Sequence, residues 1–248
     1  MKLYKGVDGI IRTYRADYKW FKLNDGVSKL VLPNFDFEIL NRCLSKFARH
    51  YAHLLPDSKT NGSIYLRINV FEDTNTLEIS GAGEATLSVI GSIVGPYYAG
   101  TRKHIKVRVE TERMKNFDGS LAYVKSSANY APTHLPDAIS SKMGYDTTLW
   151  LYNHLYLAEL SVGNIFMVLK EGSERKVITP PAKYILFPGS FRDAIITMII
   201  DWEIPFEERL VPICDVKQLI ADGKILEMFS TGHYVMVTPI VEINYKNE

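Results

Sequence analysis

A lysine that follows a short apolar run is the residue of this sequence with the clearest chemical potential. Residues 121–124 are apolar, and Lys125 comes directly after them, ahead of Asn129 and Tyr130. Most lysines in such places reach water through their aliphatic stem, which would make Lys125 an ordinary exposed charge. A partly desolvated lysine amine would instead be a nucleophile that forms Schiff bases with carbonyl groups. This window alone leaves both interpretations open.

Three other places in the chain carry weaker chemical signals. Gly189 and Ser190 precede an expected apolar helix, and backbone N–H groups at the positive end of a helix dipole can bind a phosphate. Residues 230–233 (Ser-Thr-Gly-His) form either a second anion-binding turn or an ordinary loop. Glu159 lies in a largely apolar segment, where an acid is usually an exposed loop residue. If Glu159 is buried, it needs a cationic or protonated partner.

Apolar periodicity predicts the elements that must position these residues. Residues 2–15 read as a hairpin, and Asp17 is expected to cap a helix that reaches Leu30. A second helix is expected over 36–53, followed by strands over 63–71 and 85–94. Beyond these, strands are expected at 105–110, 121–125, 148–152, 164–169, 207–211 and 235–238, a short extended segment at 177–181, and helices at 134–144, 194–202 and 215–221.

Composition narrows the class of protein. The chain has 248 residues, of which 46% are apolar and 23% charged, as in ordinary globular proteins. A net charge of +1 implies no strong attraction to nucleic acid or to an anionic membrane. The two cysteines have no zinc-binding spacing, and no long apolar segment is present. We therefore expect a cytoplasmic protein with no nucleic-acid partner, no membrane partner and no bound metal.

A Gly-Pro break at residues 95–100 is the candidate domain boundary. It predicts a small N-terminal α/β domain over 1–97, a linker over 98–105 and a larger α/β domain over 106–248 that carries Lys125.

The chain resembles the fold-type-IV enzymes that use pyridoxal 5′-phosphate (PLP), specifically the branched-chain amino acid aminotransferases. The resemblance rests on an order of residues: a lysine, a tyrosine five residues later, an acid, a Pro-Gly turn and a glycine-containing turn. It implies a mixed α/β, two-domain fold whose N-terminal domain is incomplete at its start. The segments that carry it are YKGVD at 4–8, SIYLR at 63–67, VGPY at 94–97, KSSANY at 125–130, ELSVGN at 159–164, TPP at 179–181, PG at 188–189, ER at 208–209 and EMF at 227–229.

The resemblance also implies roles for single residues. Lys125 would hold PLP as a Schiff base and then move a proton on the substrate, Tyr130 would hydrogen-bond the ring hydroxyl, and Glu159 would keep the ring nitrogen protonated. Arg67 is the natural partner of the distal carboxylate of glutamate. Tyr65 and Tyr97 either line the substrate pocket or only fill a core or its rim. The other cofactor-binding positions are Lys5, Gly189, Ser190, Phe191 and His233, and the full substrate set is Tyr65, Arg67, Tyr97, His233 and Tyr234.

Four departures from the family pattern indicate a divergent paralogue. Lys5 stands where the family usually has an arginine against the phosphate, and a lysine lacks the guanidinium fork. The Pro-Gly turn continues with Ser190 and Phe191 instead of a small aliphatic residue and threonine. His233 and Tyr234 replace threonine and alanine in the later turn. The chain also starts inside the family's N-terminal domain.

Three functions follow as hypotheses. The first is PLP-dependent transamination of branched-chain or similar apolar L-amino acids with 2-oxoglutarate, by a homodimer. The second is another reaction of the same fold, such as a lyase or a transaminase of altered substrate, which His233 and Tyr234 motivate. The third is a non-catalytic relative that has lost PLP binding, which the altered phosphate contacts and the short N-terminal part motivate.

Overall fold

The computed structural model describes residues 1–74, 83–95, 104–183, 185–233 and 236–246. The chain divides into two compact units, Met1–Ala99 and Gly100–Glu248, and each is described by itself.

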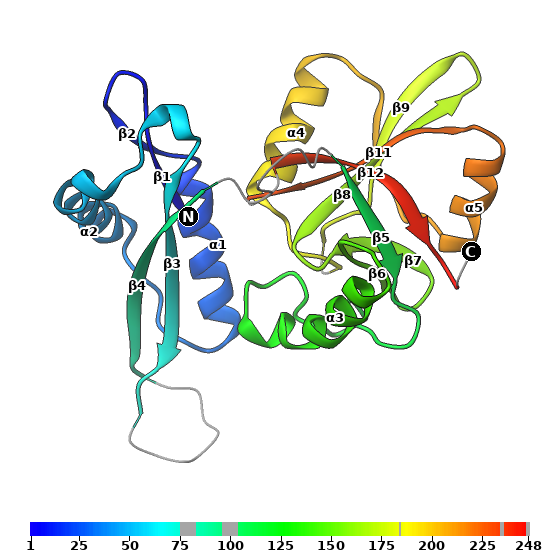
Figure 1. Ribbon diagram of the computed structural model, residues 1–248. Coiled ribbons are helices and arrows are strands. Elements are labelled where there is room, and N and C mark those ends of the chain that lie inside the picture. Colours follow the sequence, from blue (N-terminus) through cyan, green and yellow to red (C-terminus); the bar gives the residue numbers. More distant parts are fainter. Residues whose placement is uncertain (75–82, 96–103, 184, 234–235, 247–248) are drawn as a thin grey trace. The chain divides into compact units, whose positions relative to one another are not determined.

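Unit 1 is built on a sheet with the strand order β2-β1-β3-β4 (Figure 1). Strands β1 (Lys2–Lys5) and β2 (Ile11–Thr13) form the expected hairpin, closed by a hydrogen bond of 2.9 Å from Gly6 N to Ile10 O. Gly9 has a φ of +76°, which a residue with a side chain rarely adopts. Strands β3 (Ser63–Glu72) and β4 (Ala85–Val94) pair antiparallel along their whole length and confirm both predicted strands.

Two helices complete unit 1: α1 (Ala16–Lys29) and α2 (Phe37–His50). Asp36 caps α2 by accepting a 2.8 Å hydrogen bond from Ile39 N. Helix α2 ends at His50, three residues before the predicted end, and a short 3-10 turn (Ala52–Leu54) follows it. The predicted cap Asp17 is wrong, because α1 begins at Ala16 and places Asp17 inside its first turn. A second 3-10 turn covers Ser58–Thr60.

The core of unit 1 lies between α2 and one face of the sheet. Leu3, Ile64, Leu66 and Leu55 are buried there, and side chains of α2 pack against them. Because side chains alternate along a strand, the neighbours of Ile64 and Leu66 on β3 point to the opposite face.

Unit 2 is built around a closed ring of strands. Among the described residues its sheet has the order β10-β9-β8-β11-β12-β5-β6-β7, and β7 also pairs with β8. The ring therefore runs from β8 through β11, β12, β5, β6 and β7 back to β8 (Figure 1). Its strands are β5 (Ile105–Val109), β6 (Thr147–Tyr152), β7 (Tyr156–Leu160), β8 (Gly163–Glu171), β11 (Ile225–Gly232) and β12 (Met236–Asn244), and β9 (Glu174–Thr179) and β10 (Phe206–Glu208) extend it.

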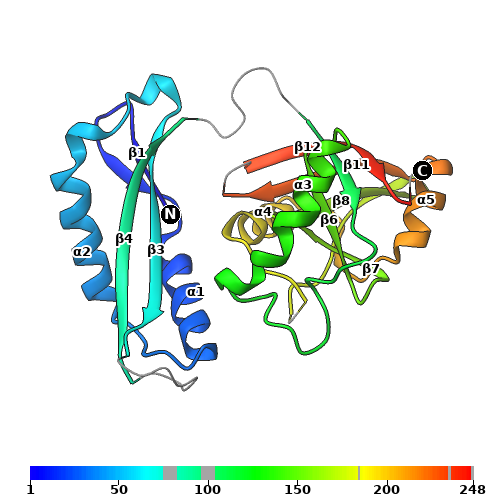
Figure 2. The ribbon, with the colours of Figure 1, turned by 60° about the horizontal axis from the view of Figure 1, so that its bottom comes forward.

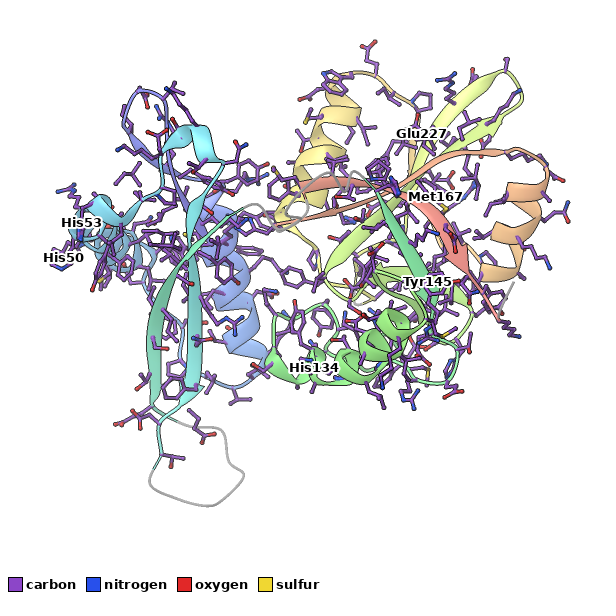
Figure 3. All side chains as sticks on the ribbon, in the orientation of Figure 1. His50, His53, His134, Tyr145, Met167 and Glu227 are labelled. Carbon is purple, nitrogen blue, oxygen red and sulfur yellow. The ribbon has the colours of Figure 1, made fainter. Side chains whose placement is uncertain are left out.

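Strand β8 is buried on both of its faces. Ile165 and Met167 are fully buried on one face, and Figure 3 labels Met167. Phe166 lies on the other face, where its ring stacks on Phe229 at 5.2 Å and packs with Ile199 of helix α4 (Ser190–Asp201). Figure 2 shows α4 beside β11 and β8. A strand covered on both faces explains why 164–169 reads as a continuous apolar run.

Unit 2 contains two further helices, α3 (His134–Lys142) and α5 (Ile213–Ala221), and two short 3-10 turns, Ser127–Asn129 and Ala131–Thr133. Gly144, at which α3 was expected to end, has a φ of +88° just beyond the helix. The predicted strand over 121–125 is wrong. This segment is a turn in which Val124 N donates to Leu121 O at 2.8 Å, and its apolar character reflects the burial of Ala122 and Val124.

Candidate active site

The side chain of Asn129 holds the turn before Lys125. Asn129 Nδ2 donates to the carbonyl oxygens of Leu121 and Val124, the second at 2.7 Å. The Asn-Tyr pair therefore fixes the segment that carries the lysine. It also places the tyrosine beside the lysine, because Lys125 Nζ lies 2.5 Å from Tyr130 OH.

The described residues leave Lys125 exposed, so unit 2 by itself does not desolvate this amine. The second neighbour of the amine is an aromatic ring, since Lys125 Nζ lies 5.1 Å from the centroid of the Phe187 ring. Of the two interpretations of Lys125, the exposed lysine is the one that unit 2 supports, and its amine lies beside a phenol and a phenyl ring.

Glu159, on β7, is a buried acid with a buried cation. The carboxylate is 3% exposed and forms an ion pair with Lys115, which is 6% exposed. Asn116 Nδ2 donates to the same oxygen, Oε1, at 3.1 Å, and Phe187 N donates to Oε2 at 3.3 Å. The expectation that a buried Glu159 needs a cationic partner is confirmed. Sequence reasoning missed that partner, because Lys115 lies 44 residues away in a segment without regular periodicity.

The segment 185–189 is held by three side chains from different parts of unit 2. Asn116 Nδ2 donates to Ile185 O at 2.7 Å, and Glu159 accepts from Phe187 N. Asn164 Nδ2 donates to Phe187 O at 2.8 Å, while its Oδ1 accepts from Gly189 N at 3.1 Å. The contacts of Glu159 and of Lys125 therefore meet at Phe187, one at its backbone and the other at its ring.

A row of buried polar residues crosses three strands beside this segment. Glu159 of β7 pairs with Asn164 of β8, which pairs with Thr231 of β11. Directly opposed residues of antiparallel strands project from the same face, so the row faces the Pro-Gly turn that Asn164 contacts. Among the described residues, Thr231 Oγ1 and Asn116 Oδ1 are buried without a hydrogen-bond partner. Buried polar atoms without a partner are rare and often mark a place for a ligand or a water molecule.

The two predicted anion-binding turns lie next to each other. Helix α4 begins at Ser190, four residues earlier than predicted, so Ser190 and Phe191 form its first turn. No side chain among the described residues caps this turn, and its N–H groups lie at the positive end of the helix. The rings of Phe191 and His233 have centroids 6.0 Å apart. Phe191 and His233, which stand at two of the four places where this sequence departs from the family pattern, therefore contact each other.

The remaining predicted site residues belong to unit 1 or are not described. Lys5 is exposed at the end of β1, opposite Ile11. Tyr65 and Arg67 project from the same face of β3, away from the core that holds Ile64 and Leu66. The predicted substrate residues Tyr97 and Tyr234 lie outside the described residues.

The donor set of unit 2 fits PLP. A primary amine beside a phenol suits an aldehyde next to a ring hydroxyl, a buried carboxylate suits a ring nitrogen, and an uncapped helix start suits a phosphate. Asn116 Oδ1 and Thr231 Oγ1 add unsatisfied polar atoms at the same place.

None of the described helices is long and apolar enough to cross a membrane.

Comparisons with known proteins agree with this chemistry. Residues 12–243 match the family described as amino-transferase class IV. The branched-chain-amino-acid aminotransferase of Dictyostelium discoideum is 30% identical over 251 residues, which are 100% of this chain and 66% of that protein. The chain spans 59 to 66% of the first curated relatives that it matches. Enzymes of this class use PLP.

Solved structures show that the fold is shared. The branched-chain aminotransferase of Thermoproteus uzoniensis with norvaline has a TM-score of 0.81 at 20% identity, over 98% of this chain and 75% of that one. The PLP-form of the Thermobaculum terrenum branched-chain amino acid aminotransferase has a TM-score of 0.76 at 19% identity, over 98% and 74%. This chain belongs to the class IV aminotransferase family.

Proposed function

We propose that this protein transfers amino groups from branched-chain or similar apolar L-amino acids to 2-oxoglutarate, with PLP bound covalently at Lys125. The observation that carries the proposal is the convergence of the Lys125–Tyr130 pair and the Glu159 carboxylate on Phe187. When bound, PLP supplies an electron sink for bond breaking at the α-carbon of the amino acid.

The residues of unit 2 have separate tasks in this proposal. Lys125 Nζ would hold the cofactor and would carry a proton to and from the substrate carbon. Tyr130 OH would hold Nζ in place and hydrogen-bond the ring hydroxyl. Glu159 would serve the ring nitrogen. The N–H groups of Gly189, Ser190 and Phe191 at the start of α4, together with His233, would hold the phosphate. Lys5 is proposed separately as a cation for the phosphate.

Substrate recognition is assigned to five residues. Arg67 binds the distal carboxylate of glutamate or 2-oxoglutarate, because a guanidinium can form a bidentate pair with a carboxylate. Its position on the face of β3 opposite Ile64 and Leu66, together with Tyr65, supports this role. The other proposed substrate residues are Tyr97, His233 and Tyr234.

A second function is favoured by one specific observation. Phe191 and His233 fill the two turns proposed for the phosphate and contact each other. A bulky pair at this place supports either an altered reaction of the same fold or a relative that no longer holds PLP.

We further propose a homodimer in the cytoplasm that acts on small amino acids and 2-oxo acids, although the relatives carry both cytosolic and mitochondrial names.

The test is the visible absorption spectrum of the purified protein after addition of PLP. The wild type is expected to gain the band of a cofactor bound covalently to a lysine, and Lys125→Ala is expected to lack it. Lys142→Ala is the matched control, because Lys142 is an exposed lysine in the last turn of α3. A band that survives in Lys125→Ala contradicts the assignment of the lysine. No retained PLP in the wild type favours the non-catalytic relative.

A further inference from the structure

One fully buried hydroxyl group of unit 2 has no use in the fold. Thr231, on β11, is completely buried, and its Oγ1 has no hydrogen-bond partner among the described residues. A hydroxyl can donate one hydrogen bond and accept two, and burying it without any of them costs free energy of folding. Such a group in a native structure calls for an explanation, and a ligand that supplies the missing partner is one.

The position of Thr231 on β11 fixes the face from which its side chain projects. Thr231 lies two residues after Phe229, and side chains two residues apart on a strand share a face. The Phe229 ring packs against the cluster that contains Ile199 of α4. The Thr231 side chain therefore projects from the face of β11 that α4 covers.

The neighbouring strands indicate which part of α4 this hydroxyl meets. Glu159, Asn164 and Thr231 lie directly opposite one another on β7, β8 and β11. Glu159 accepts a hydrogen bond from Phe187 N, and Asn164 bonds both Phe187 O and Gly189 N. The backbone of this segment therefore advances from β7 over β8 in the direction of β11. The first turn of α4 comes next, beside Thr231.

A separate contact supports this placement. The rings of Phe191, in the first turn of α4, and His233, just beyond β11, have centroids 6.0 Å apart. Thr231 lies two residues before His233, so its hydroxyl and the N–H groups of the turn are hydrogen-bond donors at one place. No side chain among the described residues caps that turn. Donors that converge at the positive end of a helix fit an anion.

We propose that the Thr231 hydroxyl is a ligand of the cofactor phosphate, to which it donates a hydrogen bond beside the N–H groups at the start of α4. This inference rests on the proposed function and adds a residue to its phosphate site. A phosphate oxygen is a charged acceptor, and hydrogen bonds to charged acceptors are stronger than those between neutral groups. Thr231 therefore helps the site to prefer the phosphorylated cofactor over the same ring without a phosphate.

The first test compares PLP with pyridoxal, which has the same ring and aldehyde but no phosphate. The dissociation constants of both are measured by absorption titration of the full-length protein, and their ratio reports the phosphate site. Thr231→Val replaces the hydroxyl with a methyl group of similar size, and is expected to reduce the preference for PLP by about tenfold. Thr231→Ser keeps the hydroxyl and is expected to keep most of the preference.

Thermal unfolding without PLP separates this role from a structural one. Because Thr231 Oγ1 has no partner among the described residues, Thr231→Val is expected to leave the thermal midpoint of the cofactor-free protein unchanged or raised. Thr148→Val is the matched control, since Thr148 is also fully buried on a strand but its Oγ1 lies 2.9 Å from Ser140 Oγ. This control is expected to lower the midpoint and to leave the preference for PLP unchanged.

The outcomes separate the inference from the proposed function. An unchanged preference for PLP in Thr231→Val overturns the inference and leaves the proposed function intact. A clearly lower midpoint of cofactor-free Thr231→Val, or its failure to fold, also overturns it, because the hydroxyl would then serve the fold. A wild type that binds neither PLP nor pyridoxal defeats the proposed function, and the inference falls with it.

Discussion

Three lysines of this chain lie in three different electrostatic settings, and the settings decide what each amine can do. Lys125 is exposed beside a phenol, and Lys115 is buried beside a carboxylate. Lys19, on α1, is half-buried, and its amine donates to the carbonyl oxygen of Tyr14 and lies 5.6 Å from the centroid of the Tyr14 ring. A neutral carbonyl oxygen compensates less of the free-energy cost of desolvating an ammonium than a carboxylate does.

The stability of unit 1 is expected to depend on pH through Lys19. Burial lowers the pKa of the Lys19 amine from 10.5 to about 8. Between these values the unfolded chain binds the proton more tightly than the folded chain, so raising the pH from about 8 to 10.5 increases the free energy of unfolding. The measurement is the thermal midpoint of unfolding across this range. The thermal midpoint of Lys19→Met is expected to rise less across this range than that of the wild type.

The exposed helical lysine Lys46, on α2, provides the control for this pH series. The thermal midpoint of Lys46→Met should rise with pH as steeply as that of the wild type. If Lys19→Met and the wild type gain the same stability between pH 8 and 10.5, the carbonyl and the ring compensate the ammonium fully and the argument fails.

At the scale of single residues, sequence reasoning identified the chemically distinctive residues but not their partners. The five-residue spacing of Lys125 and Tyr130 is local, and the structure brings the two side chains into contact. The pairing of Glu159 with Lys115 depends on a contact between residues 44 apart. Nothing in the residues around Lys115 indicates burial, so only the folded chain reveals this ion pair.

The turn before α4 depends on one glycine and one asparagine from another strand. A Cβ built on Gly189 would lie 2.7 Å from Asn164 Oδ1, which is closer than real Cβ contacts. The φ of Gly189 is −70°, so its backbone conformation suits any residue and only the contact excludes a side chain. The glycine therefore allows the asparagine amide to hold the turn.

A double-mutant cycle tests this coupling. Gly189→Ala alone is expected to reduce the free energy of unfolding by about 1–3 kcal/mol, because the added methyl group displaces the amide. In an Asn164→Ala background the obstructing oxygen is gone, so the same change should cost less. The expected coupling is about 0.5–3 kcal/mol, measured by urea denaturation.

Gly95→Ala is the matched control for the cycle, since a Cβ there meets no atom of the described residues within 4 Å. It should leave stability nearly unchanged in both backgrounds. If Gly189→Ala and Asn164→Ala reduce the free energy of unfolding in a strictly additive way, the Asn164 amide and the glycine at position 189 are not coupled.

At the scale of elements, periodicity predicted most strands and helices but failed where a side chain replaces backbone pairing. Alternation along 63–71 correctly predicts β3, whose two faces differ in burial. The apolar run 121–124 has the composition of a strand, yet Asn129 takes two of its carbonyl oxygens and closes it as a turn. A hydrogen bond from a side chain several residues away leaves no mark in the hydrophobic pattern.

At the scale of the whole molecule, each of the two units contains a core of its own. Leu3, Ile64 and Leu66 are buried in unit 1, while Phe166, Val177 and Ile199 form a cluster in unit 2. The division of the chain after Ala99 falls within the predicted linker 98–105, and the linker itself stays a prediction because most of it lies outside the described residues. The closed order of strands in unit 2 could not be predicted, since it depends on pairings such as β12 with β5, which lie far apart in the sequence.

A fragment of residues 100–248 is expected to fold alone and to bind PLP covalently, more weakly than the whole chain does. A domain with its own core can fold independently, and Lys125, Tyr130, Glu159 and the start of α4 all belong to unit 2. The substrate residues assigned to unit 1, Tyr65, Arg67 and Tyr97, would be missing, so amino transfer should be lost while the cofactor bond persists. Cooperative thermal unfolding by circular dichroism tests folding, and borohydride reduction followed by peptide mass spectrometry locates the bound cofactor.

The same fragment with Lys125→Ala controls for labelling of other lysines. A fragment that unfolds cooperatively but carries the label at another lysine would place the cofactor chemistry elsewhere, whereas a fragment without cooperative unfolding would show that unit 2 needs unit 1 for its stability.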